Sequence, residues 1–108
     1  MWTPVEVYQG QPALTETTMY TVPAGRQLVV KEFIICNTDT VERTLTINAR
    51  RGGAAAGVTR RILHNTPVPP GLPVYFPCSM VMAAGGILSG LSSVATITVT
   101  VSGEERTV

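Results

Sequence analysis

The chain has 108 residues, which is enough for one domain with a single core and too few for two. Eight basic side chains against seven acidic ones give no strong positive field, so neither nucleic acid nor an anionic membrane is expected as a partner. Only 14% of the residues are charged and 44% are hydrophobic, a surface composition that favours burial against copies of the chain or a larger assembly.

Proline and glycine punctuate residues 1–18, which predicts either an edge strand or an arm, because proline is tolerated only at a sheet edge or outside the sheet. Trp2 and Tyr8 lie in this segment. An aromatic side chain near a terminus either packs on its own core or is presented to a neighbour, so both residues are candidates for a partner interface. The segment has no basic and apolar regions of the kind found in a signal peptide.

Residues 20–37 are predicted to organise the fold. Pro23 and Gly25 mark a turn, since proline presets the backbone and glycine tolerates positive φ. From residue 27 to residue 36 nearly every side chain is β-branched, aromatic or aliphatic, which is typical of a strand covered on both faces. We interpret it as the central strand of a sandwich, with Val30 and Ile34 in the core.

Residues 43–50 alternate apolar and polar side chains, which predicts a half-buried strand paired with the preceding one as an antiparallel hairpin. Residues 51–57 are small and glycine-rich and predict a loop, without the Lys-Ser/Thr of a phosphate-binding motif. A short strand is expected at 58–63. Arginines flank the loop on both sides and suit bidentate contacts at interface rims, so four of them are further partner candidates: Arg50, Arg51, Arg60 and Arg61.

The prolines of residues 64–73 predict a stiff connection between the two sheets, in which His64 is a surface residue rather than a catalyst. Met80 and Met82 fall on one face of the next apolar run and suit core filling or an adaptable contact. Residues 94–101 show the clearest strand alternation in the sequence. Cys36 and Cys78 are expected to be buried free thiols, with a disulfide as the alternative and no zinc site.

Strand signals separated by Gly/Pro turns predict an all-β chain, a single antiparallel β-sandwich or jelly roll of about seven to eight strands. We expect this domain to occupy residues 19–103, between the N-terminal segment 1–18 and a polar, solvated tail at 104–108. With one histidine, no paired carboxylates beside a cleft and no nucleophile elbow, the sequence predicts no enzyme, and no catalytic, cofactor-binding or metal-binding residues.

The turn at residues 20–25, the apolar strand with Val30-Lys31-Glu32, and the closing Ile97-Thr-Val-Thr-Val-Ser-Gly103 resemble a pattern in small β-sandwich structural proteins of tailed bacteriophages. The resemblance implies a virion protein, assembled in the host cytoplasm, that oligomerises and decorates or cements the capsid or forms part of the tail. A homotrimer is the first expectation, with a major capsid or tail protein as partner. The alternative is a carbohydrate- or receptor-binding module of a tail fibre, which would use exposed aromatics: Trp2, Tyr8, Tyr20 and Tyr75.

Overall fold

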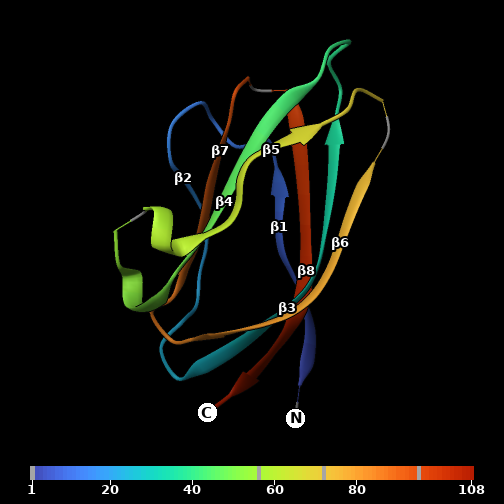
Figure 1. Ribbon diagram of the computed structural model, residues 1–108. Coiled ribbons are helices and arrows are strands. Elements are labelled where there is room, and N and C mark those ends of the chain that lie inside the picture. Colours follow the sequence, from blue (N-terminus) through green and yellow to red (C-terminus); the bar gives the residue numbers. More distant parts are fainter. Residues whose placement is uncertain (1, 56, 72, 95) are drawn as a thin grey trace.

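A computed structural model describes residues 2–55, 57–71, 73–94 and 96–108 and shows two four-stranded sheets packed face to face (Figure 1). The first sheet has the order β1-β8-β3-β6 and the second the order β2-β7-β4-β5. The strands are β1 Thr3–Gly10, β2 Thr17–Thr21, β3 Arg26–Asn37, β4 Arg43–Arg50, β5 Arg61–Val68, β6 Val74–Ala83, β7 Ile87–Ser92 and β8 Ile97–Thr107. Two short 3₁₀ helices, Arg51–Gly53 and Val58–Arg60, lie between β4 and β5.

The strand order is that of a jelly roll. The antiparallel pairs β1–β8, β2–β7, β3–β6 and β4–β5 nest inside one another like a long hairpin that has been rolled up. Rolling places β8 between β1 and β3, and β7 between β2 and β4. The predicted all-β sandwich is therefore confirmed. In the described residues no helix is both long and apolar enough to span a membrane.

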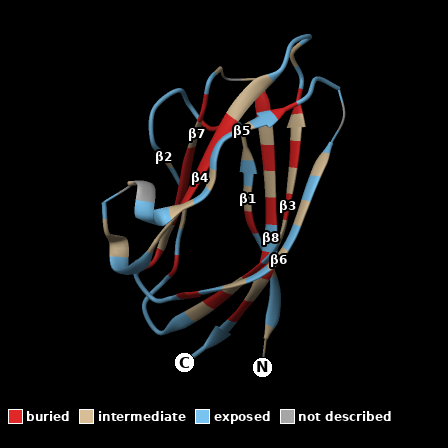
Figure 2. Ribbon diagram, in the orientation of Figure 1, coloured by how far each residue is buried: buried red, intermediate tan, exposed pale blue. Residues whose placement is uncertain are grey.

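The core lies between the sheets, where the inward rows of both sheets are buried (Figure 2). Strand β3 supplies Leu28, Val30, Phe33 and Ile35, each at most 2% exposed. The opposite sheet contributes Leu45, Ile47 and Leu88, and β8 contributes Ile97, Val99 and Val101. The alternation predicted for residues 94–101 holds in β8 from Ile97 onward, while Ala95 lies outside the described residues. The half-buried strand predicted at 43–50 is wrong for its centre, because Thr46 and Asn48 on the outer face are buried as well.

A β-bulge at Lys31 changes which residues of β3 face the core. The pairing of β3 with both of its neighbours shifts between Val30 and Glu32. Before the bulge the even-numbered residues point inward, and after it Phe33 and Ile35 do. The prediction was right for Val30 and wrong for Ile34, which is half-buried on the outer face, and the strand is fully covered on one face only.

The predicted hairpin between residues 27–36 and 43–50 is wrong. β3 pairs with β6 and β8, whereas β4 pairs with β5 and β7 in the opposite sheet. The buried Asn37 supports the crossing between them, because its Nδ2 donates to the carbonyl oxygens of Val41 at 2.9 Å and Val68 at 3.0 Å. Alternation indicates which side chains of a strand share a face, but it does not show which strand lies beside it.

Both chain ends belong to the first sheet. β1 is an edge strand hydrogen-bonded to β8, and its Val7 is 5% exposed, so residues 3–10 are not a free arm. β8 continues to Thr107, and Glu105 is buried, so the solvated tail expected at 104–108 is wrong for 104–107. These charged residues alternate in register with β3, and only their outward members meet solvent.

The segment after β4 also differs from the prediction. Residues 58–60 form a 3₁₀ turn, and the strand begins at Arg61 and runs to Val68, with Pro67 inside it. Proline is compatible with this position because β5 is the edge strand of its sheet. Gly25, in the predicted turn, has φ of 76°, as expected.

Candidate functional site

The structure brings four of the six proposed interface residues together and separates the other two. Arg50, Arg51, Arg60 and Arg61 flank the β4–β5 connection, whereas Trp2 and Tyr8 lie along β1. The Arg106 guanidinium lies 4.9 Å from the centre of the Trp2 ring, a cation–π contact within the chain. Tyr8 is half-buried and packs against the core. Both aromatic side chains are half-buried within the chain, and their role in a partner interface stays a prediction.

Three of the arginines are engaged within the chain, Arg50 and Arg60 with the β4–β5 connection and Arg61 with a residue of β5. Arg50 Nε donates to the Ala54 carbonyl at 2.5 Å, and Arg60 Nη1 donates to Thr59 Oγ1 at 2.5 Å. Arg61 Nη1 lies 2.8 Å from Nδ1 of the exposed His64. Arg51 is exposed, and its side chain has no hydrogen bond or ion pair within the residues described.

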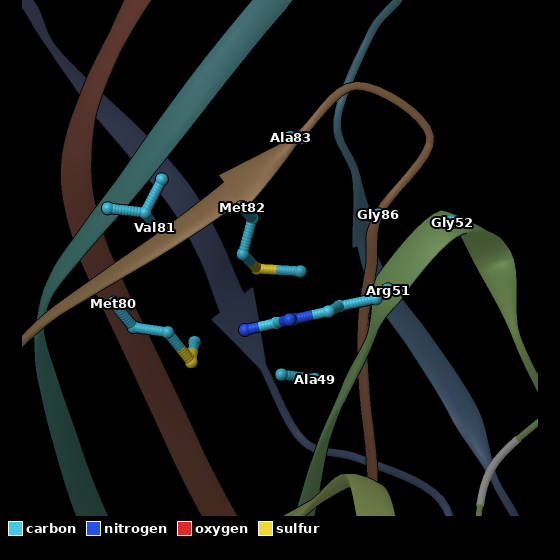
Figure 3. Close-up of a pocket in the computed structure, with 8 residues that line it drawn as sticks. All are labelled: Ala49, Arg51, Gly52, Met80, Val81, Met82, Ala83 and Gly86. Atoms are coloured by element: carbon cyan, nitrogen blue, oxygen red, sulfur yellow. The ribbon is translucent and has the colours of Figure 1, made fainter.

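Arg51 lies at an open pocket of about 410 Å³ between the β4–β5 connection and the end of β6. Its side chain extends across the pocket toward Met80 and Met82 (Figure 3). The remaining lining residues are Ala49, Gly52, Val81, Ala83 and Gly86. The surface is therefore mostly apolar and flexible, with one cation on it.

The pocket exists because β5 is shorter than the strands around it. The pairing of β4 with β5 ends at Asn48 and Arg61, although β4 continues to Arg50. β6 runs on to Ala83 and pairs with β3 but with no other described strand. At the end of β6, Met82 is still 6% exposed and part of the core, whereas Met80 is only half-buried, so the open space lies at the edge of the core beside these two side chains.

A second apolar area lies on the outer face of the first sheet. Val29 is paired with Val81, and Ile34 with Tyr75, across β3 and β6. Tyr75 is 59% and Val81 56% exposed. The β8 part of the same face is polar, with Thr98, Thr100 and Ser102. The apolar area is thus confined to the edge formed by β6, where a neighbouring molecule can reach it.

A buried carboxylate closes the end of the sandwich where the termini lie. Tyr20 Oη donates to Glu105 Oε2 at 2.5 Å, and Arg26 Nη1 is 3.6 Å from Glu105 Oε1. Burial, and then the hydrogen bond to Glu105, raises the pKa of Tyr20 from 10.0 to about 12. The contacts among Tyr20, Glu105 and Arg26 hold β2 against β3 and β8, so we do not assign these side chains to a partner interface.

This raised pKa predicts a loss of stability in strong base. Between pH 10 and about 12 the unfolded chain releases the Tyr20 proton while the folded chain keeps it, so the free energy of unfolding falls as pH rises. The urea midpoint of the native protein should drop more between pH 9 and pH 11 than that of Tyr20→Phe, which is less stable at neutral pH. An equal drop in both proteins would show that Tyr20 titrates normally.

The chain matches no protein-family model and no curated protein. Among solved structures, it is similar to VP2 of the infectious bursal disease virus subviral particle, with a TM-score of 0.51 and 13% identity over 97% of this chain and 32% of that one. The likeness is one of fold. The chain spans about a third of the VP2 chain.

Two structures of a pentameric capsid protein from metagenomic phage sequences also align. The first has a TM-score of 0.38 and 20% identity, over 98% of this chain and 59% of that one. The second has a TM-score of 0.40 and 21% identity, over 98% and 60%. TM-scores this low do not establish a common fold.

Proposed function

We propose that the protein is a virion structural protein, a jelly roll that acts by making repeated contacts with copies of itself and with other virion proteins. The observation that carries the proposal is the rolled eight-strand order, which extends over the whole domain and is similar in fold to VP2 of a viral particle over 97% of the chain. The apolar outer area around Tyr75 and Val81 supports it, because a surface of this kind is stable when a neighbour covers it.

Within this class, the resemblance to small tailed-phage sandwich proteins supports a role in decorating or cementing a capsid, or in a tail. We propose a homotrimer as the first assembly to test, with a major capsid or tail protein as the further partner. A closed symmetric oligomer repeats the same contact in every subunit. A small domain can therefore bind a particle tightly through several weak contacts made at the same time.

The tail-fibre alternative receives no support from the aromatic side chains. A sugar site needs exposed rings beside polar groups in a shallow cleft, but Trp2 is covered by Arg106, Tyr8 packs on the core and Tyr20 is bonded to Glu105. Of these four aromatic residues only Tyr75 is strongly exposed, and the residue paired with it, Ile34, is apolar.

Self-association is the first measurement. Light scattering and analytical ultracentrifugation over a wide concentration range should show homo-oligomers, and negative-stain electron microscopy should show their symmetry. Replacing both Tyr75 and Val81 with Lys should weaken association and leave the melting temperature within a few degrees. Ser102→Lys, on the polar part of the same face, is the matched control and should assemble normally. A monomer at every concentration would contradict the proposal.

A further inference from the structure

The pocket beside Arg51 has a definite chemical preference. Met80 and Met82 offer an apolar, deformable lining, and the Arg51 guanidinium extends across the pocket toward them (Figure 3). A side chain that fills the lining gains burial, and a carboxylate next to it pairs with the guanidinium. The matching occupant is therefore a bulky apolar residue with an acidic neighbour.

The chain itself carries one such segment among its described residues. Val41 is 49% exposed in the β3–β4 connection, and the next residue is Glu42, also exposed and without an ion pair in the part of the chain that is described. Four other exposed large hydrophobic residues have no acidic residue on either side in the sequence, and Val108 has none before it: Leu14, Ile62, Tyr75 and Val81.

The β3–β4 connection is held in shape before any contact forms. The Val41 carbonyl accepts from Asn37 Nδ2 at 2.9 Å, and Arg43 Nη2 pairs with Asp39 Oδ2 at 2.7 Å. A hydrogen bond from the Thr40 amide, and then one from Arg43, lower the pKa of Asp39, so these contacts persist at neutral pH. A segment fixed in this way loses little entropy on binding.

The segment cannot reach the pocket of its own molecule. β4 separates them, since the connection precedes Arg43 and the pocket begins at Ala49, near the other end of this eight-residue strand. At about 3.3 Å per residue, the strand spans roughly 25 Å. The contact must therefore join two molecules through different surfaces, and contacts of this type repeat from copy to copy into a ring or an open array.

We propose that the pocket receives the β3–β4 connection of a second copy, with Val41 against Met80 and Met82 and Glu42 paired with Arg51. The proposal rests on the self-association proposed above and adds a second contact to it, beside the outer area around Tyr75 and Val81. The proposal gives Arg51 an ion-pair partner and gives the pocket beside the end of β6 an occupant.

Charge reversal tests the pairing. Arg51→Glu and Glu42→Arg should each weaken self-association about tenfold or more, the effect of losing a close interfacial charge pair. An equimolar mixture of the two variants should associate again into assemblies in which they alternate, which a closed ring allows only with an even number of copies. Glu42 of the Arg51→Glu protein then meets Arg51 of the Glu42→Arg protein, and the two reversed side chains meet each other. Glu6→Arg, an exposed reversal on β1, is the control and should not change association. Unchanged association of both single variants would overturn the proposal.

Disulfide trapping tests the contact without requiring a stable oligomer. Val41→Cys and Ala83→Cys proteins, mixed under mild oxidation, should form a crosslinked dimer, whereas Val41→Cys mixed with Ala24→Cys, exposed in the β2–β3 turn, should not. The native chain reports any background from the half-buried Cys36 and Cys78.

The two experiments separate this proposal from the proposed function. Native oligomers without selective trapping would mean that another surface assembles the protein and that the pocket takes a different occupant, so the pairing is wrong and the structural role stands. Selective trapping in a protein that never forms stable oligomers would support the pairing and contradict the structural role.

Discussion

Val30→Asp is expected to abolish folding. Val30 is 0% exposed, in the middle of β3, with β6 and β8 on its two sides. A carboxylate there loses its water without gaining a partner, which costs several kcal/mol and is comparable with the whole stability of a small domain. The variant should appear in the insoluble fraction, and any soluble protein should show no cooperative melt by circular dichroism.

Ile34→Asp is the matched control for this substitution. It makes the same chemical change four residues later in the same strand, but the bulge at Lys31 puts Ile34 on the outer face, where water reaches the side chain. We expect this variant to fold, to melt cooperatively at a lower temperature, and to lose self-association because the charge enters the apolar area beside Tyr75. Equal unfolding of both variants would mean that the bulge is not where the structure has it.

Gly103→Ala is expected to be the second most damaging change. A Cβ at position 103 would lie 2.3 Å from the Val29 carbonyl oxygen and 3.2 Å from the Val30 Cα, both backbone atoms of β3. Backbone in the middle of a sheet cannot move aside as a side-chain tip can, so the cost should exceed the usual ~1–3 kcal/mol of overpacking. The melting temperature should fall by roughly 10 °C or more.

Gly57→Ala provides the comparison for this prediction. Apart from its two chain neighbours, no heavy atom of the described residues lies within 4 Å of a Cβ built at Gly57, which belongs to the β4–β5 connection. An added methyl there should change the free energy of unfolding by no more than about 0.5 kcal/mol. Urea titrations of both variants measure the difference, and similar losses would show that the close approach at Gly103 is relieved by a small shift of β3.

The sequence was sufficient to predict the class of fold and most strand positions, because alternation and Gly/Pro turns are local signals. It was insufficient for strand pairing, as the wrong β3–β4 hairpin shows, for the start of β5, and for two local features of β3 and β8. The bulge at Lys31 changes the inward-facing residues of β3 without any break in its apolar composition, so Ile34 was misplaced. The charged residues before Val108 predicted a solvated tail, although β8 continues through them. Glu105 is buried there because Tyr20 and Arg26, from distant parts of the chain, contact its carboxylate.

The candidate site was predicted only in pieces. The sequence predicted that Met80 and Met82 could form an adaptable contact and that Arg51 is a candidate for a partner interface. It did not predict that these three residues line the same pocket. It depends on β5 beginning at Arg61, after a 3₁₀ turn, and on β4 and β6 lying in different sheets. Both are properties of pairing between segments far apart in the chain, which no single-sequence pattern specifies.

The place of β8 also sets the order of events during synthesis. The final strand of the chain fills the gap between β1 and β3, so the first sheet has two open edges and an uncovered core row until residues 97–107 leave the ribosome. Unpaired strand edges of this kind pair readily with other chains and promote aggregation, and pairings between distant segments of one chain form slowly. Nascent chains should therefore depend on chaperones or on low local concentration, and the surface of β3 and β6 becomes fit for association only after the last strand has inserted.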